Sequence, residues 1–78
     1  MTPCDEQLDA RGLACPLPVL KAKKRLYELD AGQVLRVLAE DPGSVKDFDA
    51  FSRQTGNELL EFEERPDHYC FLLRRHNP

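Results

Sequence analysis

Val34-Leu35-Arg36-Val37-Leu38-Ala39 is an almost wholly apolar run between two polar segments, residues 30–33 and residues 40–44. A run this short and this apolar predicts a central, covered strand. Strands of this kind are typical of the centre of a parallel βαβ unit. The run therefore predicts a central strand in an α/β fold.

A helix is predicted on each side of this strand. Each helix carries an apolar face at helical spacing: Val19, Ala22, Leu26 and Leu29 in residues 16–29, and Val45, Phe48, Phe51 and Thr55 in the helix after the strand. Gly32 is predicted to stop the first helix, and Gly56 the second. The start of the second helix stays open. Asp41 can cap a helix whose first residue is Pro42, or Ser44 can cap one that begins at residue 45.

The remaining segments predict three more strands. Residues 6–10 form a short first strand, and residues 57–64 and 68–75 form a hairpin around Arg65-Pro66-Asp67. In the hairpin we expect Leu60 and Phe62 to share one face. The order βαβαββ predicts an α/β two-layer sandwich, in which right-handed crossovers place both helices on one face of a four-stranded mixed sheet.

Length and charge set limits on function. Seventy-eight residues with 41% hydrophobic content predict one small domain over residues 1–78. The net charge of −3 argues against general nucleic-acid binding. We expect a cytoplasmic protein without a membrane partner, because we find neither a membrane-spanning apolar run nor a secretory signal. The charges are uneven, which suits a monomer that docks transiently on an acidic partner. The basic group is Lys21, Lys23, Lys24 and Arg25, and the acidic group is Glu58, Glu61, Glu63 and Glu64.

The three cysteines do not predict a disulfide framework, because their number is odd. A strand separates Cys4 from Cys15 by roughly 20 Å, too far for a bridge. Cys70 lies in an apolar run and is predicted to be a small buried residue. No metal ligand set is predicted: His68 and Cys70 have no third or fourth ligand at useful spacing. We interpret His68 as a hairpin residue without a proton-transfer partner.

Cys15 stands out because it precedes Pro16-Leu17-Pro18 and the first helix. Proline fits the first helical turn, and it favours an extended, N-cap-like conformation at the residue before it. We therefore expect Cys15 at the helix N-terminus, where the dipole and free N–H groups favour the nucleophilic thiolate. In this interpretation Pro16 and Pro18 set the direction of the thiol. Gly12 is predicted to provide a turn with positive φ.

The whole chain resembles the TusA/SirA family of sulfur-carrier proteins. The residues that carry this resemblance are Leu8-Asp9-Ala10-Arg11-Gly12-Leu13, Cys15-Pro16-Leu17-Pro18-Val19, Ala31-Gly32, Ala39-Glu40-Asp41-Pro42-Gly43-Ser44 and the closing hairpin. The resemblance implies the sheet order 1-2-4-3 and a persulfide carried on Cys15. It also implies a cysteine desulfurase as sulfur donor, an acceptor sulfurtransferase and no bound cofactor. Partner docking is expected to use Arg11, Lys23, Lys24 and Asp41.

The end point of such a pathway stays open. In the best-known branch of the family the sulfur reaches 2-thiouridine of tRNA, while other branches serve sulfur oxidation or molybdenum-cofactor synthesis. The tRNA branch usually has a glutamate between the two prolines, and this chain has Leu17. Two other functions also stay open. One is a thiol redox enzyme, which the absence of a resolving cysteine disfavours, and the other is a non-catalytic regulatory or binding module.

Overall fold

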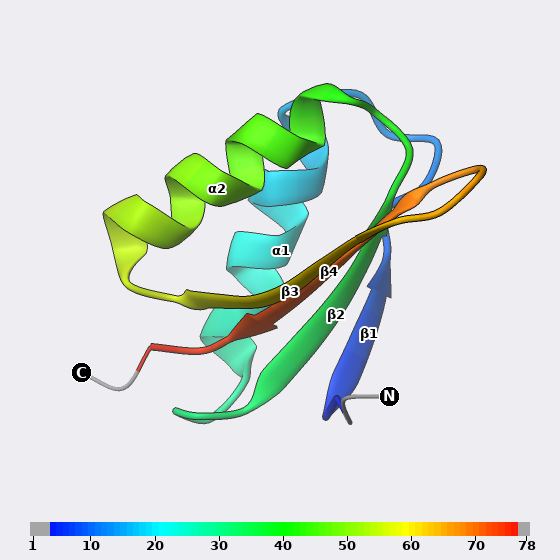
Figure 1. Ribbon diagram of the computed structural model, residues 1–78. Helices are drawn as coiled ribbons and strands as arrows, with labels where there is room; N and C mark the ends of the chain where they lie inside the picture. The colour runs from blue at the N-terminus through cyan, green and yellow to red at the C-terminus, as the bar shows by residue number, and fades with distance from the viewer. Residues whose placement is uncertain (1–3, 77–78) are drawn as a thin grey trace.

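The computed structural model describes residues 4–76 and contains the six predicted elements in the predicted order (Figure 1). These are β1 (Glu6–Asp9), α1 (Leu17–Glu28), β2 (Val34–Ala39), α2 (Gly43–Thr55), β3 (Glu58–Glu64) and β4 (Tyr69–Arg74). The bounds of β2 are those that its apolar run predicts. Among the described residues, no helix has the length and apolar character needed to cross a membrane.

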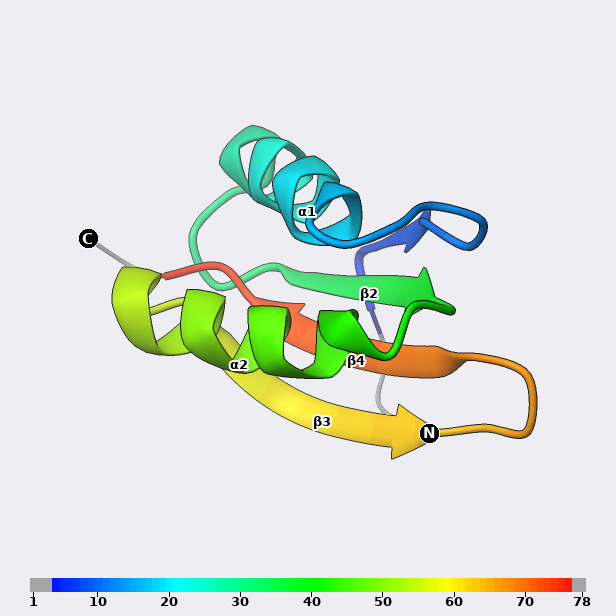
Figure 2. The same ribbon diagram turned by 90° about the horizontal axis from the view of Figure 1, so that it is seen from above.

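The four strands form one mixed sheet in the order β1-β2-β4-β3. β1 and β2 are parallel, whereas β4 is antiparallel to both of its neighbours. The connection through α2 skips one position in the sheet, and β4 fills it. Both helices lie on one face, α1 toward β1 and β2 and α2 toward β3 and β4 (Figure 2). The two-layer α/β fold and the expected strand order are therefore confirmed.

The core lies between the helices and the sheet. Its centre is the pair of Phe48 on α2 and Phe71 on β4, whose ring centroids are 4.4 Å apart and whose side chains are fully buried. The predicted inner faces of the helices supply much of the rest. The buried cluster comprises Leu8, Ala10, Ala22, Leu26, Leu29, Leu35, Val37, Ala39, Phe48, Phe51, Phe71 and Leu73. The predicted burial of Cys70 is also confirmed.

The prediction that Leu60 and Phe62 share one face of β3 is wrong. A register irregularity lies between Leu59 and Glu61, so that Leu59 pairs with Leu73 and Phe62 pairs with Phe71. Residues paired across two strands lie on the same face. Leu59, rather than Leu60, therefore shares the core face with Phe62, and Leu59 packs against the core cluster. An extra residue in one strand shifts the alternation beyond it, which simple period-two spacing does not reveal.

The end of α1 also differs from the prediction. The helix stops at Glu28, its C-cap is Leu29 in an extended conformation, and Gly32 lies in the following turn. The guanidinium of Arg75 donates hydrogen bonds to the carbonyl oxygens of Tyr27 and Leu29. A side chain from the C-terminal end of the chain thus satisfies carbonyl groups that a glycine C-cap motif would otherwise have closed. α2 ends at Thr55 with Gly56 as its C-cap, so the predicted stop at Gly56 is confirmed.

Replacement of Phe48 tests the position of the core. Phe48→Ala removes a fully buried ring and should lower the free energy of unfolding by about 3–5 kcal/mol, measured by urea denaturation. Leu20→Ala on α1 is the matched control, because its side chain is 54% exposed. Its effect should stay within about 0.5 kcal/mol. Equal effects of the two substitutions would contradict this assignment of the core.

Candidate functional site

Cys15 is exposed in the connection between β1 and α1. α1 begins at Leu17, the Cys15–Pro16 peptide bond is cis, and the N–H of Leu17 donates to the carbonyl oxygen of Ala14 at 2.9 Å. The N-cap position falls on Pro16, and Cys15 lies outside the helix. The expected N-cap position of Cys15 is therefore wrong by one residue. Pro18 is buried in the first turn of α1.

Asp41 joins the Cys15 loop to the start of α2. One carboxylate oxygen accepts the N–H of Cys15 at 2.8 Å, and the other accepts the N–H of Gly43 at 2.8 Å. These two backbone hydrogen bonds lower the pKa of Asp41 below its ordinary value, because they favour the charged carboxylate. Neither predicted helix start is confirmed: α2 begins at Gly43, with Pro42 at the N-cap position, one residue after the start that an Asp41 cap predicts. Ser44 is fully buried, and its hydroxyl has no hydrogen-bond partner in the described part of the chain.

Asp47 contacts the sulfur of Cys15. The thiol S–H donates a hydrogen bond to the Oδ2 atom of Asp47. This hydrogen bond, with partial desolvation and the negative charges of Asp47 and Asp41, raises the pKa of Cys15 from 9.0 to about 11. The expected stabilisation of the thiolate is therefore wrong for this geometry. Two carboxylates beside the sulfur oppose a negative charge on it.

Gly43 allows the loop and the helix to approach each other closely. A Cβ atom at this position would lie 3.2 Å from Cys15 Cβ, 3.4 Å from Cys15 Sγ and 3.2 Å from Asp41 Oδ1. Gly43 and Asp47 are four residues apart on α2, so they lie on the same face of the helix. On that face, Gly43 leaves space for the Cys15 side chain, and Asp47 places a carboxylate beside its sulfur.

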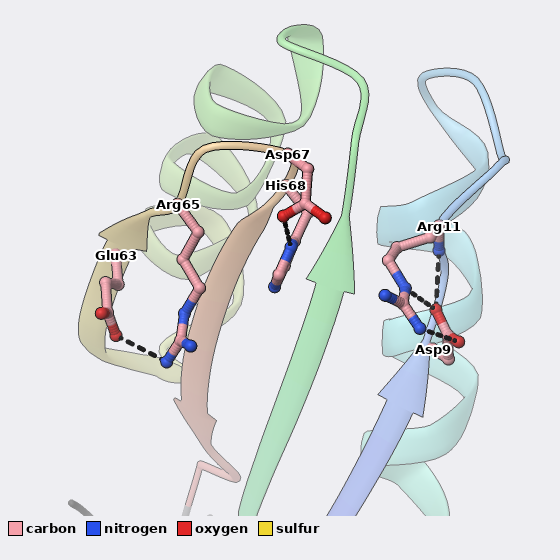
Figure 3. Close-up of polar contacts among 6 residues, drawn as sticks. All are labelled: Asp9, Arg11, Glu63, Arg65, Asp67 and His68. Atoms are coloured by element: carbon pink, nitrogen blue, oxygen red, sulfur yellow. Dashed lines mark hydrogen bonds and ion pairs between the residues drawn. The ribbon is translucent and has the colours of Figure 1, made fainter.

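Arg11 and Gly12 lie in the loop before the thiol. Arg11 forms a bidentate pair with Asp9, through Nε at 2.9 Å and Nη2 at 3.0 Å (Figure 3). The side-chain hydrogen bond from Arg11 is the main reason that the pKa of Asp9 falls to about 2. Gly12 has φ of +85°, as predicted, which few other residues adopt without strain. The guanidinium of Arg11 is thus held at the end of β1.

Lys23 and Lys24 lie on different surfaces of α1. Lys23 borders a shallow pocket with Tyr27 and Phe51. Lys24 borders another with Leu8 and Glu28. Of the residues expected to dock a partner, the structure therefore brings Asp41 to Cys15 and places these two lysines at separate pockets.

The hairpin turn carries two further polar contacts. Nδ1 of His68 lies 2.6 Å from Oδ1 of Asp67, and Arg65 pairs with Glu63 at 3.1 Å (Figure 3). The prediction that His68 lacks a proton-transfer partner is therefore wrong. Within residues 4–76 no cluster of three or more His, Cys, Asp or Glu side chains could hold a metal ion.

Sequence reasoning missed Asp47 and Gly43. A usable signal was present, because the β1–α1 and β2–α2 connections follow parallel neighbouring strands and meet at one edge of the sheet. With α2 beginning at Gly43, Gly43 and Asp47 fall on one face of the helix. The sequence left the start of this helix open, and only the folded chain shows it.

The fold and the site define a small two-layer α/β protein with an exposed thiol at the edge of its sheet. The family model described as sulfurtransferase TusA matches residues 6–75. The sulfur carrier protein TusA of Allochromatium vinosum is 57% identical over 75 residues, which cover 96% of this chain and 99% of that protein. The crystal structure of the SirA-like protein from Desulfitobacterium hafniense matches with a TM-score of 0.80 and 30% identity, over 92% of this chain and 99% of that one. The chain belongs to the TusA/SirA family of sulfur-carrier proteins.

The link made by Asp41 can be tested by removing its carboxylate. Asp41→Ala leaves the N–H groups of Cys15 and Gly43 without their acceptor and should lower the urea midpoint of unfolding. It should also speed amide hydrogen exchange at both positions. The control is Asp49→Ala, which removes an exposed carboxylate of α2 that pairs only with Arg53 among the ion pairs described. Exchange at Cys15 that is as slow in Asp41→Ala as in the control would contradict the link.

Proposed function

We propose that this protein accepts sulfane sulfur from a cysteine desulfurase as a persulfide on Cys15 and passes it to an acceptor protein. The observation that carries the proposal is the exposed Cys15 thiol, held at the edge of the sheet by Asp41 in a chain of the sulfur-carrier family. A carrier needs an accessible sulfur on a surface that two successive partners can reach. It needs no bound cofactor, because the donor supplies activated sulfur.

The loading step exchanges one sulfur–sulfur bond for another. Cys15 Sγ forms a bond to the outer sulfur of the donor persulfide while the S–S bond of the donor breaks. The Cys15 thiol and the donor persulfide thus become a Cys15 persulfide and a donor thiol. The proton of the Cys15 thiol ends on the donor sulfur, so no external oxidant or reductant is required. Discharge to an acceptor thiol follows the same exchange.

One feature bears on the partners and another on the cellular compartment. Leu17 and Leu20 are 45% and 54% exposed near the start of α1, so the surface beside the thiol is partly apolar. This supports partners that bury apolar area there, with tRNA thiolation as one of several possible end points. We place the carrier in the cytoplasm, where thiols stay reduced, and this setting suits its three free cysteines.

Mass spectrometry tests the carrier function. After incubation with a cysteine desulfurase and cysteine, the protein should gain one sulfur atom on the peptide that contains Cys15. Cys15→Ser should abolish this gain, because serine has no sulfur to form the persulfide. Cys4→Ser is the control and should load like the wild type. A wild-type protein that stays unmodified with several desulfurases would rule out the proposed function.

Charge reversal tests which surface of α1 meets the donor. Lys23→Glu and Lys24→Glu alter two different surfaces. The substitution at the docking surface should slow sulfur loading at low salt by on the order of tenfold, with less effect at high salt. Lys46→Glu on α2 is the control for net charge. Loading rates that are equal in all three variants would show that neither lysine takes part in docking.

A further inference from the structure

We propose that Asp47 is a positioning residue that keeps the Cys15 thiol protonated and weakly nucleophilic until a sulfur donor docks. The inference rests on the proposed function, because it concerns the thiol that would carry the sulfur. It goes further by assigning a role to a side chain that contacts the reactive sulfur.

Three contacts place the sulfur against the carboxylate. Asp41 accepts the backbone N–H of Cys15 and so holds the loop beside the start of α2. Gly43 leaves the space in which Cys15 Cβ and Sγ lie, because any side chain there would begin within 3.4 Å of Sγ. One turn further along α2, the partly buried Asp47 accepts the S–H hydrogen bond.

The charges around the sulfur all favour the thiol. The groups that act on it are Asp47 on α2 and Asp41 in the β2–α2 connection, and both are carboxylates. In the preceding loop, the cation of Arg11 is paired with Asp9. On α1 the nearest cationic residue in the sequence is Lys21, in the second turn. With the pKa of Cys15 raised to about 11, only a small fraction of the sulfur is ionised at neutral pH.

A protonated thiol suits a carrier between transfers. The thiolate is the form that reacts with alkylating agents and oxidants, so the hydrogen bond to Asp47 protects an exposed sulfur. Loading then requires a donor that draws the Asp47 carboxylate away by offering it a hydrogen-bond donor or a cation. Reactivity would thereby be coupled to docking.

The rate of Cys15 alkylation as a function of pH tests this role. Iodoacetamide is the probe, and the peptide containing Cys15 is quantified by mass spectrometry in the wild type and in Asp47→Asn. The wild-type profile should have its midpoint near pH 11, and Asp47→Asn should move it toward 9.0. The charge of Asp41 and the desolvation of Cys15 persist in this variant, so the shift should be smaller than the full difference. At pH 8 each unit by which the pKa falls increases the thiolate fraction about tenfold, and the lower nucleophilicity of a more acidic thiol offsets about threefold of it. The net expectation is a reaction about threefold faster for each unit by which the pKa falls.

The matched control is Asp49→Asn, which removes a carboxylate from the same helix and should keep the wild-type profile. The urea midpoint of each variant checks its folding, and Asp47→Ser replaces Asp47→Asn if the latter does not fold. An Asp47→Asn profile that coincides with the wild type would overturn the proposal. A slower reaction at pH 8 would do so as well, because it would make Asp47 a base that assists attack.

This experiment is independent of sulfur loading. If Asp47→Asn shifts the alkylation profile but no desulfurase loads the wild type, the role of Asp47 stands and the proposed function fails. If the wild type gains sulfur on Cys15 but the profile does not move, the proposed function stands and the role of Asp47 is rejected.

Discussion

The carboxylate of Asp41 holds together two parts of the chain that are separated by β2. It accepts one N–H from the Cys15 loop and one from the first turn of α2, both at 2.8 Å. A charged acceptor shared by two backbone donors is a strong and directional contact. Because it ties both connections to one edge of the sheet, the sulfur of Cys15 lies within hydrogen-bond reach of Asp47. The geometry of the site depends on this one side chain.

The site combines an exposed sulfur with a suppressed charge. A helix N-terminus alone would favour the thiolate, whereas Asp47 and Asp41 favour the thiol and raise the pKa of Cys15. In a sulfur carrier with this combination, the sulfur is accessible to partners although its nucleophilic thiolate form is scarce. A partner can reach the sulfur directly, and its nucleophilicity then depends on whether the hydrogen bond to Asp47 persists when the partner binds.

Much of the fold could be predicted because its signals are local. The apolar run of β2 and the helical spacing of Phe48 and Phe51 depend only on neighbouring residues, and the structure agrees with both. The face of β3 could not be predicted in the same way. One irregularity between Leu59 and Glu61 shifts the alternation, and its position depends on pairing with β4. The end of α1 likewise depends on Arg75, which is distant in the sequence.

The order of the elements, the two-layer α/β class and the cysteine that carries the proposed chemistry could all be predicted from the sequence alone. These follow from periodicity, from proline and glycine at turns, and from the motif Cys15-Pro16-Leu17-Pro18. The carboxylate that contacts this cysteine could not be predicted in this way. Asp47 is 32 residues away in the chain, and its contact with the sulfur exists only because parallel strands bring two connections to the same edge of the sheet.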